Sequence, residues 1–269
     1  MGKLKVKNTL LIDGSAIVHR AYHALPPFTS LDGTPTNALH GFITMFLSMI
    51  NMFHPSYLAV CLDTPKPTFR KKILPTYQAQ RPKAPENLSR QFPLVIEFLK
   101  SSHIFGVSKE GFEADDVIAT LADYAQKEIP DSHIYIVTGD KDILQLVNDR
   151  VTVAMPKSGI RTVELMDSMA VYKKLGIQPS QVVDYKTLAG DPSDNYSGVP
   201  GIGPKKASNL LTRYGTVENV YKHLDDIEER TQAVLKKYKE NVSIAKELAQ
   251  LKNNVQVDIK ISDLRYLGL

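Results

Sequence analysis

The chain has 269 residues, 43% of them hydrophobic and 23% charged, which is enough for one large globular domain or two smaller ones. The formal net charge of +4 permits a nucleic-acid partner but does not require one. A single cysteine, Cys61, excludes an internal disulfide and fits a reducing cytoplasm. We expect no membrane association, because no apolar run approaches ~18 residues and the basic start lacks the apolar core of a signal peptide.

Short apolar runs alternate with helical patterns in the first part of the chain. The apolar runs predict buried strands at 9–12, 57–62, 134–137 and 151–154. Helical spacing predicts helices at 39–53, 93–105, 113–126 and around 144–147. Strands that alternate with helices indicate an α/β fold, with a mainly parallel sheet covered on both faces.

Three of the predicted strands are followed by an acidic residue at or just after their end. These residues are Asp13, Asp63 and Asp140. In a parallel sheet they would meet at one edge, where open α/β sheets bind their ligands. Asp13 and Asp140 can instead be read as caps of the helices that follow them. Capping does not explain why negative charge should be concentrated in one place without a counter-ion.

A further acidic group, Glu113, Asp115 and Asp116, lies where a helical pattern begins. One interpretation is an acidic first turn stabilised by the helix dipole. The other is a divalent-metal site built from oxygen ligands. The acids at the strand ends favour the metal site.

Residues 64–90 form a basic segment of different character. It contains five prolines and seven positive charges against one acid, Glu86, with Phe69 and Tyr77 interleaved. This composition predicts a mobile excursion that binds a nucleic-acid strand, with cations on phosphates and rings on bases. The alternative is a solvated basic loop without a ligand.

The last third of the chain adds two acids, Asp191 and Asp194, and then a glycine-rich turn at 198–203. Such a turn between helices exposes backbone N–H groups to a DNA phosphate, and Lys205 and Lys206 follow it. This pattern indicates a helix-hairpin-helix; the alternative is a plain packing corner. A nucleotide-binding loop is rejected, because Pro204 stands where its lysine would be. Helices are predicted at 225–239 and 241–251, and extended chain after 253.

In their order, six of these motifs resemble the bacterial 5′-3′ exonucleases of the flap endonuclease superfamily, and most closely the amino-terminal 5′-nuclease domains of bacterial DNA polymerase I. The resemblance covers residues 8 to 260. It rests on 11–14 (Leu-Ile-Asp-Gly), 61–63 (Cys-Leu-Asp), 113–116 (Glu-Ala-Asp-Asp), 138–142 (Thr-Gly-Asp-Lys-Asp), 190–195 (Gly-Asp-Pro-Ser-Asp-Asn) and 198–203 (Gly-Val-Pro-Gly-Ile-Gly).

The resemblance implies a Rossmann-like, PIN-like core over residues 1–180 with the arch at 64–90, and a helix-hairpin-helix subdomain over 181–269. It also implies two or more Mg²⁺ or Mn²⁺ ions. The implied metal ligands are Asp13, Asp63, Glu113, Asp115, Asp116, Asp140, Asp142, Asp191 and Asp194. We expect Asp115, Asp116, Asp63 and Asp140 around the nearer ion, and Asp191 and Asp194 around the farther one.

The resemblance assigns DNA contacts as well. Arg20 and Arg81 are expected to hold phosphates, and Tyr77 to stack on the base beside the scissile bond. The composition of the basic segment adds further expected DNA contacts in the arch, namely Arg70, Lys71, Lys72, Gln78 and Lys83. The hairpin residues Gly198, Gly201, Ile202, Gly203, Lys205 and Lys206 are expected to grip duplex DNA, with a monovalent cation such as K⁺.

One position departs from the family pattern. The family usually has Tyr-Lys-x-x-Arg-Pro in the arch, whereas this chain has Gln78 after Tyr77. Loss of that charge would reduce the rate on the order of 10²-fold. Lys71, Lys72 and Lys83 are candidates to replace it.

The expected function is therefore a structure-specific, metal-dependent 5′-3′ exonuclease and 5′-flap endonuclease acting in replication and repair. Two alternatives are a DNA-junction-binding protein, catalytically weak because of Gln78, and a compact RNase. We expect a monomer that acts on DNA with a 5′ flap or 5′ end at a duplex junction, in the bacterial cytoplasm at the nucleoid. A DNA polymerase is an expected partner, and the sequence leaves open whether the chain is free-standing or part of one.

Overall fold

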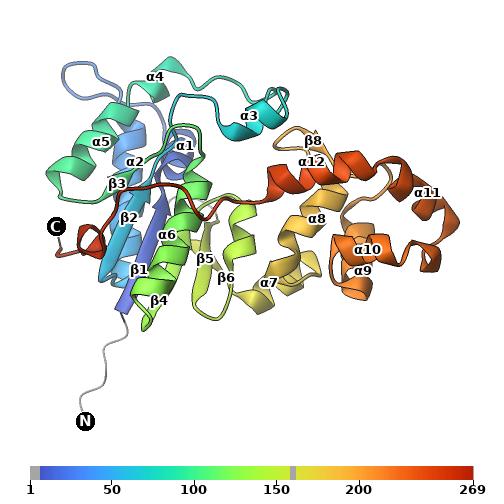
Figure 1. Ribbon diagram of the computed structural model, residues 1–269. Coiled ribbons are helices and arrows are strands. Elements are labelled where there is room, and N and C mark those ends of the chain that lie inside the picture. The colour runs from blue at the N-terminus through green and yellow to red at the C-terminus, as the bar shows by residue number, and fades with distance from the viewer. Residues whose placement is uncertain (1–6, 158–161, 269) are drawn as a thin grey trace, which may run out of the picture.

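The computed structural model describes residues 7–157 and 162–268. Its main feature is a six-stranded sheet in the order β3-β2-β1-β4-β5-β6 (Figure 1). The strands are β1 (Lys7–Asp13), β2 (Tyr57–Cys61), β3 (Gly106–Val107), β4 (Ser132–Val137), β5 (Val151–Pro156) and β6 (Val163–Met166). All neighbours pair in parallel except β5 and β6, which are antiparallel. The four predicted strands and the mainly parallel sheet are confirmed.

Helices cover both faces of the sheet because successive strand residues point to opposite sides. In β1, Leu10 and Ile12 join one apolar cluster and Leu11 joins the other. The first cluster includes α1 (Gly14–Ala24), α2 (Asn37–Phe53) and α5 (Phe92–Ser101). The second includes α6 (Ala114–Glu128) and the 3₁₀ turn η1 (Asp142–Leu146). That turn replaces the helix predicted around 144–147.

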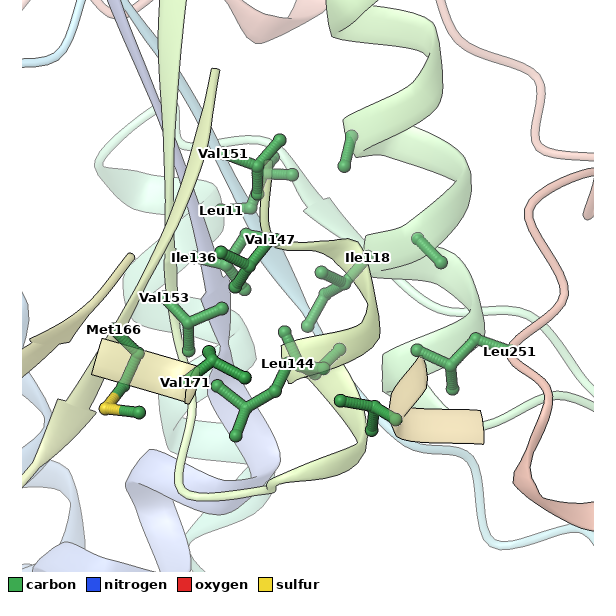
Figure 2. Packing of buried hydrophobic residues seen from close by; sticks show 14 of the residues in the cluster. Leu11, Ile118, Ile136, Leu144, Val147, Val151, Val153, Met166, Val171 and Leu251 are labelled. Carbon is green, nitrogen blue, oxygen red and sulfur yellow. The ribbon is translucent and has the colours of Figure 1, made fainter. Parts of the chain in front are cut away.

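The second cluster is the larger core, and it extends beyond the sheet. Figure 2 shows Leu11, Ile136 and Val153 of the strands facing Ile118 of α6 and Leu144 of η1. These five side chains are fully buried. The cluster then continues into the helical part of the chain, so the two parts share one apolar interior.

The helices between residues 168 and 249 lie beside the sheet, on the right of Figure 1. They are α7 (Ser168–Leu175), η2 (Pro179–Gln181), α8 (Val182–Ala189), α9 (Pro204–Tyr214), α10 (Val217–Lys222), η3 (Leu224–Asp226), α11 (Glu229–Lys237) and α12 (Lys239–Ala249). A two-stranded ribbon of β7 (Gly190–Asp191) and β8 (Tyr196–Ser197) separates α8 from α9. Among the described helices, none has the combination of length and apolar character that crossing a membrane requires.

After α12 the chain returns to the sheet (Figure 1). The extended chain predicted after 253 is interrupted by a 3₁₀ turn, η4 (Ile261–Leu264). Arg265 pairs with Tyr57 of β2, and Leu264 is fully buried in the larger core. The last residues therefore pack on the α/β part, although the predicted boundary at 180/181 assigned them to the second domain.

The basic segment 64–90 contains the short helices α3 (Phe69–Ile73) and α4 (Glu86–Ser89). The prediction of a loose excursion outside the core is wrong in part. Arg70, Tyr77 and Leu88 are each 2% exposed or less. These three buried side chains attach the segment to the rest of the fold.

Candidate active site

Acidic side chains converge at the carboxyl-terminal edge of the sheet. Strands β2, β1 and β4 are neighbours, so the residues that follow them are brought together with the first turn of α6. The residues at these strand ends and in the first turn of α6 line one pocket of about 670 Å³. Its carboxylates are Asp13, Asp63, Glu113, Asp115 and Asp140. The predicted convergence of Asp13, Asp63 and Asp140 is confirmed.

Two of these acids are held by backbone and hydroxyl donors. Asp13 caps α1, because its Oδ1 accepts a hydrogen bond of 2.9 Å from the N–H of Ala16. Its Oδ2 accepts one of 2.8 Å from the Thr138 hydroxyl, at the end of β4. Asp63 Oδ1 accepts a 2.8 Å bond from the N–H of Ala114 at the start of α6. Asp13 is thus both a helix cap and a member of the acidic pocket.

Asp115 shows that the pocket fits a cation. Its Oδ1 is buried and has no hydrogen-bond partner among the described residues. Burial, together with Asp140 and Asp13, raises the pKa of Asp115 well above its usual value. Burial also raises the pKa of Asp13 and of Glu113 to about 7. Clustered carboxylate oxygens suit hard divalent cations such as Mg²⁺ and Mn²⁺, which would compensate this repulsion.

Asp116 lies outside this pocket. Both of its oxygens accept hydrogen bonds from the guanidinium of Arg70, at 2.7 and 2.9 Å. They also accept bonds from the backbone N–H groups of Glu113 and Lys252. The expectation that Asp116 belongs to the nearer metal shell is wrong for this structure, because its carboxylate is fully buried in an ion pair. Asp116 also caps α6, which agrees with the interpretation of residues 113–116 as an acidic first turn.

Arg70 is likewise not a DNA contact. Its side chain is 2% exposed and also donates to the carbonyls of Leu248 and Gln250 beyond Asp116. Arg70 therefore ties α3 to α6 and to the end of α12. The charge pattern alone placed it among the basic residues of the arch, because nothing local distinguishes a buried arginine from an exposed one.

A second acidic group consists of Asp142, Asp191 and Asp194, each of which offers an oxygen within 4.8 Å of the others. The ammonium group of Lys186, on α8, contacts both Asp142 and Asp191. Burial alone would raise the pKa of Asp191, but the charge and hydrogen bond of Lys186, together with the hydrogen bonds from Ser193, lower it. Sequence reasoning missed Lys186; its only signal is a position near the end of the helix that leads into Gly190 and Asp191.

Asp194 joins this second group to the arch. Its Oδ1 accepts bonds from Arg81 at 2.6 Å and from Gln78 at 2.9 Å. Its Oδ2 accepts a 2.9 Å bond from the Tyr77 hydroxyl. The Tyr77 ring is 2% exposed and packs in a small apolar cluster with Tyr196. The predicted stacking of Tyr77 on a base is therefore wrong: its ring is inaccessible and instead fixes the arch to Asp194.

The arch residues expected to contact DNA take up different positions. Lys71, Gln78 and Arg81 line the acidic pocket, whereas Lys72 and Lys83 are not among its lining residues. Arg20, predicted to hold a phosphate, is not among them either; the residues of α1 that line the pocket are Ser15, Ala16 and His19. His19 therefore adds an imidazole to the wall of the pocket beside the acids.

The glycine turn forms a separate surface next to α9. Gly201, with φ of +81°, and Gly203 have open space where a Cβ would stand, and both are exposed. Gly198 has another role, since a Cβ there would lie 2.3 Å from the carbonyl oxygen of Leu188. Ile202 is 3% exposed and packs in the core, so only its backbone could approach a ligand. Lys205 is exposed at the start of α9, as a phosphate contact requires.

Comparison with known families agrees with this arrangement. Residues 8–176 match the family model for the 5′-3′ exonuclease, N-terminal resolvase-like domain. Residues 177–268 match the model for the 5′-3′ exonuclease, C-terminal SAM fold. The chain is 38% identical over 261 residues to a 5′-3′ exonuclease of Aquifex aeolicus, covering 97% of this chain and 87% of that protein.

Longer proteins also match. DNA polymerase I of Bacillus caldotenax is 39% identical over 263 residues, which cover 97% of this chain. The chain spans only 30% of the length of that polymerase.

Solved structures share the fold. The T5 D15 protein, co-crystallised with metal ions, has a TM-score of 0.73 at 22% identity, covering 91% of this chain and 90% of that one. The catalytic core of Rad2 in complex with DNA substrate has a TM-score of 0.56 at 16% identity, covering 95% and 82%. The two family models and the Aquifex aeolicus relative show that the chain belongs to the 5′-3′ exonuclease family of nucleases.

Proposed function

We propose that this protein is a structure-specific, divalent-metal-dependent 5′ nuclease. It hydrolyses DNA phosphodiesters at 5′ ends and at 5′ flaps beside duplex junctions, the reaction that removes primers and flaps during replication and repair. The observation that carries this proposal is the pocket in which the ends of β1, β2 and β4 and the start of α6 gather five carboxylates. The unpartnered oxygen of Asp115 supports a cation there.

The residues of that pocket are suited to hold Mg²⁺ or Mn²⁺. Asp13, Asp63, Glu113, Asp115 and Asp140 would bind the nearer ion, directly or through water. The group of Asp142, Asp191 and Asp194 would bind a farther ion, in competition with the ammonium of Lys186. Bound cations in such a site activate water for attack on phosphorus and stabilise the departing 3′ oxygen.

Other residues would position the DNA. Arg81 forms an ion pair with Asp194 and lines the pocket, so its guanidinium can reach a phosphate bound beside the acids. The exposed backbone of Gly201 and Gly203 would approach the duplex backbone, with Lys205 and Lys206 neutralising phosphates. A K⁺ ion at this turn is part of the same proposal. These contacts set the register of the duplex without reading its sequence, and the products carry 5′-phosphates.

The proposal extends to the cellular setting. We infer a monomer that works at the nucleoid in the bacterial cytoplasm, either with a DNA polymerase or as one part of it. The match to 30% of a DNA polymerase I supports the link to a polymerase, and the match to 87% of a separate 5′-3′ exonuclease supports a free-standing protein. Sedimentation of the purified chain tests the monomer, which a stable dimer would exclude.

A fluorescent 5′-flap duplex tests the activity. The protein is incubated with it in Mg²⁺, in Mn²⁺ and in EDTA, alongside Asp115→Asn, which keeps the size of the side chain but removes its charge. We expect cutting near the junction in both metals, and none in EDTA or with the variant. Binding without cutting in either metal would identify a junction-binding protein instead. Faster cutting of a matched RNA substrate would identify an RNase.

A further inference from the structure

The acidic pocket raises an electrostatic problem for its substrate. Five carboxylates line it, and a DNA phosphate that enters brings a further negative charge. Like charges at close range disfavour binding unless positive groups offset them. Metal ions would supply part of that charge, and the chain itself can supply more. Lys66, Lys71 and Arg81 are the Lys and Arg side chains that line the pocket.

Two of these three cations already have acidic partners. Lys66 donates to Glu110 at 2.7 Å, and both side chains are largely exposed. Arg81 donates to Asp194 at 2.6 Å. The side chain of Lys71, by contrast, forms no hydrogen bond or ion pair with any residue that the structure describes, whereas its backbone N–H donates to the carbonyl of Thr68. Its charge is therefore available to a ligand without breaking an existing interaction.

The backbone beneath Lys71 is firmly placed. The preceding residue, Arg70, is buried and bonded to Asp116. The N–H of Phe69 donates to the carbonyl of Gly111 at 2.9 Å, just before α6. A lysine has a flexible four-carbon stem with three rotatable donors at its tip. Lys71 thus combines a fixed base beside the carboxylates with an exposed tip that can follow a phosphate.

Gln78 lines the same pocket but cannot offset the negative charge of an entering phosphate. Its amide is uncharged, and Nε2 already donates to Asp194 at 2.9 Å. Its own N–H donates to the carbonyl of Asp194, also at 2.9 Å. Lys72 and Lys83, the other candidates in the basic segment, do not line the pocket.

We propose that Lys71 is a catalytic residue, whose ammonium group contacts the scissile phosphate over the carboxylate pocket and supplies the positive charge that Gln78 lacks. This inference rests on the proposed nuclease function. Lys71 accepts and releases no proton; it stabilises negative charge that grows on the phosphate oxygens during attack. It also contributes to binding, because its contact neutralises one phosphate charge.

The test compares single-turnover cleavage of a saturating 5′-flap duplex in Mg²⁺ by four variants. Lys71→Gln removes the charge, and Lys71→Arg keeps it. Lys173→Gln removes one exposed charge from α7, which lies on the lower side of the molecule in Figure 1, whereas α3 lies on the upper side. The exchange Lys71→Gln with Gln78→Lys moves the charge to the neighbouring wall of the pocket.

We expect Lys71→Gln to be slower by about 10²-fold and Lys71→Arg by less than about tenfold. The exchange variant should recover at least tenfold over Lys71→Gln, and Lys173→Gln should match the unchanged protein. Wild-type rates for Lys71→Gln, or an equal loss in Lys173→Gln, would overturn the role of Lys71. If the unchanged protein does not cut at all, the proposed function itself fails, and the two failures are distinguishable.

Binding provides a second measurement that does not depend on turnover. In an Asp115→Asn background, the affinity for the flap duplex is measured by anisotropy over a range of salt concentrations. Lys71→Gln should make the slope of log K against log[salt] shallower by about 0.9, the value for one lost phosphate contact. An unchanged slope would show that Lys71 does not touch phosphate.

Discussion

Arg70 offers a sharp test of the structure, because sequence and structure assign it opposite roles. The basic segment suggests that it binds DNA, so its loss would weaken binding and leave the fold intact. In the structure its guanidinium makes two hydrogen bonds to Asp116, at 2.7 and 2.9 Å, with side chains 2% and 0% exposed. Replacement by methionine would leave the Asp116 carboxylate buried without its partner.

The expected loss of stability is large. Removing one partner of a buried ion pair destabilises a protein by about 3–5 kcal/mol. For a protein of this size each kcal/mol shifts Tm by about 2–4 °C, so Arg70→Met should melt roughly 6–20 °C lower. The measurements are urea denaturation and thermal melting in EDTA, followed by circular dichroism. Lys72→Met, at an exposed position on the same helix, is the control and should change the free energy of unfolding by less than about 0.5 kcal/mol.

A double variant separates the ion pair from other effects. Arg70→Met combined with Asp116→Leu removes both charges, and buried pairs replaced by apolar residues are often neutral in stability. We expect the double variant to recover at least half of the loss of Arg70→Met. A loss below about 1 kcal/mol in Arg70→Met, or a double variant less stable than both single variants, would refute the reasoning.

Three further predictions concern the acids and the hairpin. Asp115→Asn should abolish Mg²⁺-dependent cleavage. In EDTA the variant should melt no lower than the unchanged protein, because the substitution removes a carboxylate whose pKa burial raises. A fall in Tm would argue against repulsion among the carboxylates of the pocket. In the folded, metal-free protein the pKa values of Asp13 and Glu113 are raised to about 7. The free energy of unfolding that these two groups contribute is therefore fully present below about pH 4, the unfolded pKa, and is lost as the pH rises through about 7. The gain in Tm on adding Mg²⁺ should therefore be larger at pH 8 than at pH 5.5, and an equal gain at both would contradict this linkage. Lys205→Gln with Lys206→Gln should weaken duplex binding and make the salt slope shallower by about 1.8, and an unchanged slope would remove the hairpin from the DNA interface.

Local sequence patterns were sufficient to predict the α/β core and the location of the first acidic group. Apolar runs with acids at their ends identify parallel strands, and any parallel arrangement brings such ends to one edge. Asp13, Asp63 and Asp140 could therefore be assigned to one site before any contact was known. The glycine turn at 198–203 could be placed in the same way, because its spacing fixes the local backbone. Local pattern is sufficient when neighbouring residues alone decide the conformation.

Tertiary structure alone decided which charges are available for chemistry. Asp115 and Asp116 are adjacent in sequence, but Asp115 lines the pocket with one buried oxygen unpartnered, whereas Asp116 is buried against Arg70. Arg70 and Lys71 are also adjacent, and only Lys71 lines the pocket. The contacts that bury Arg70 but not Lys71 come from distant residues such as Leu248, which is 178 positions from Arg70 in the chain. Neighbouring side chains on a helix point in different directions, so burial and pairing follow from the packing partners that long-range folding supplies.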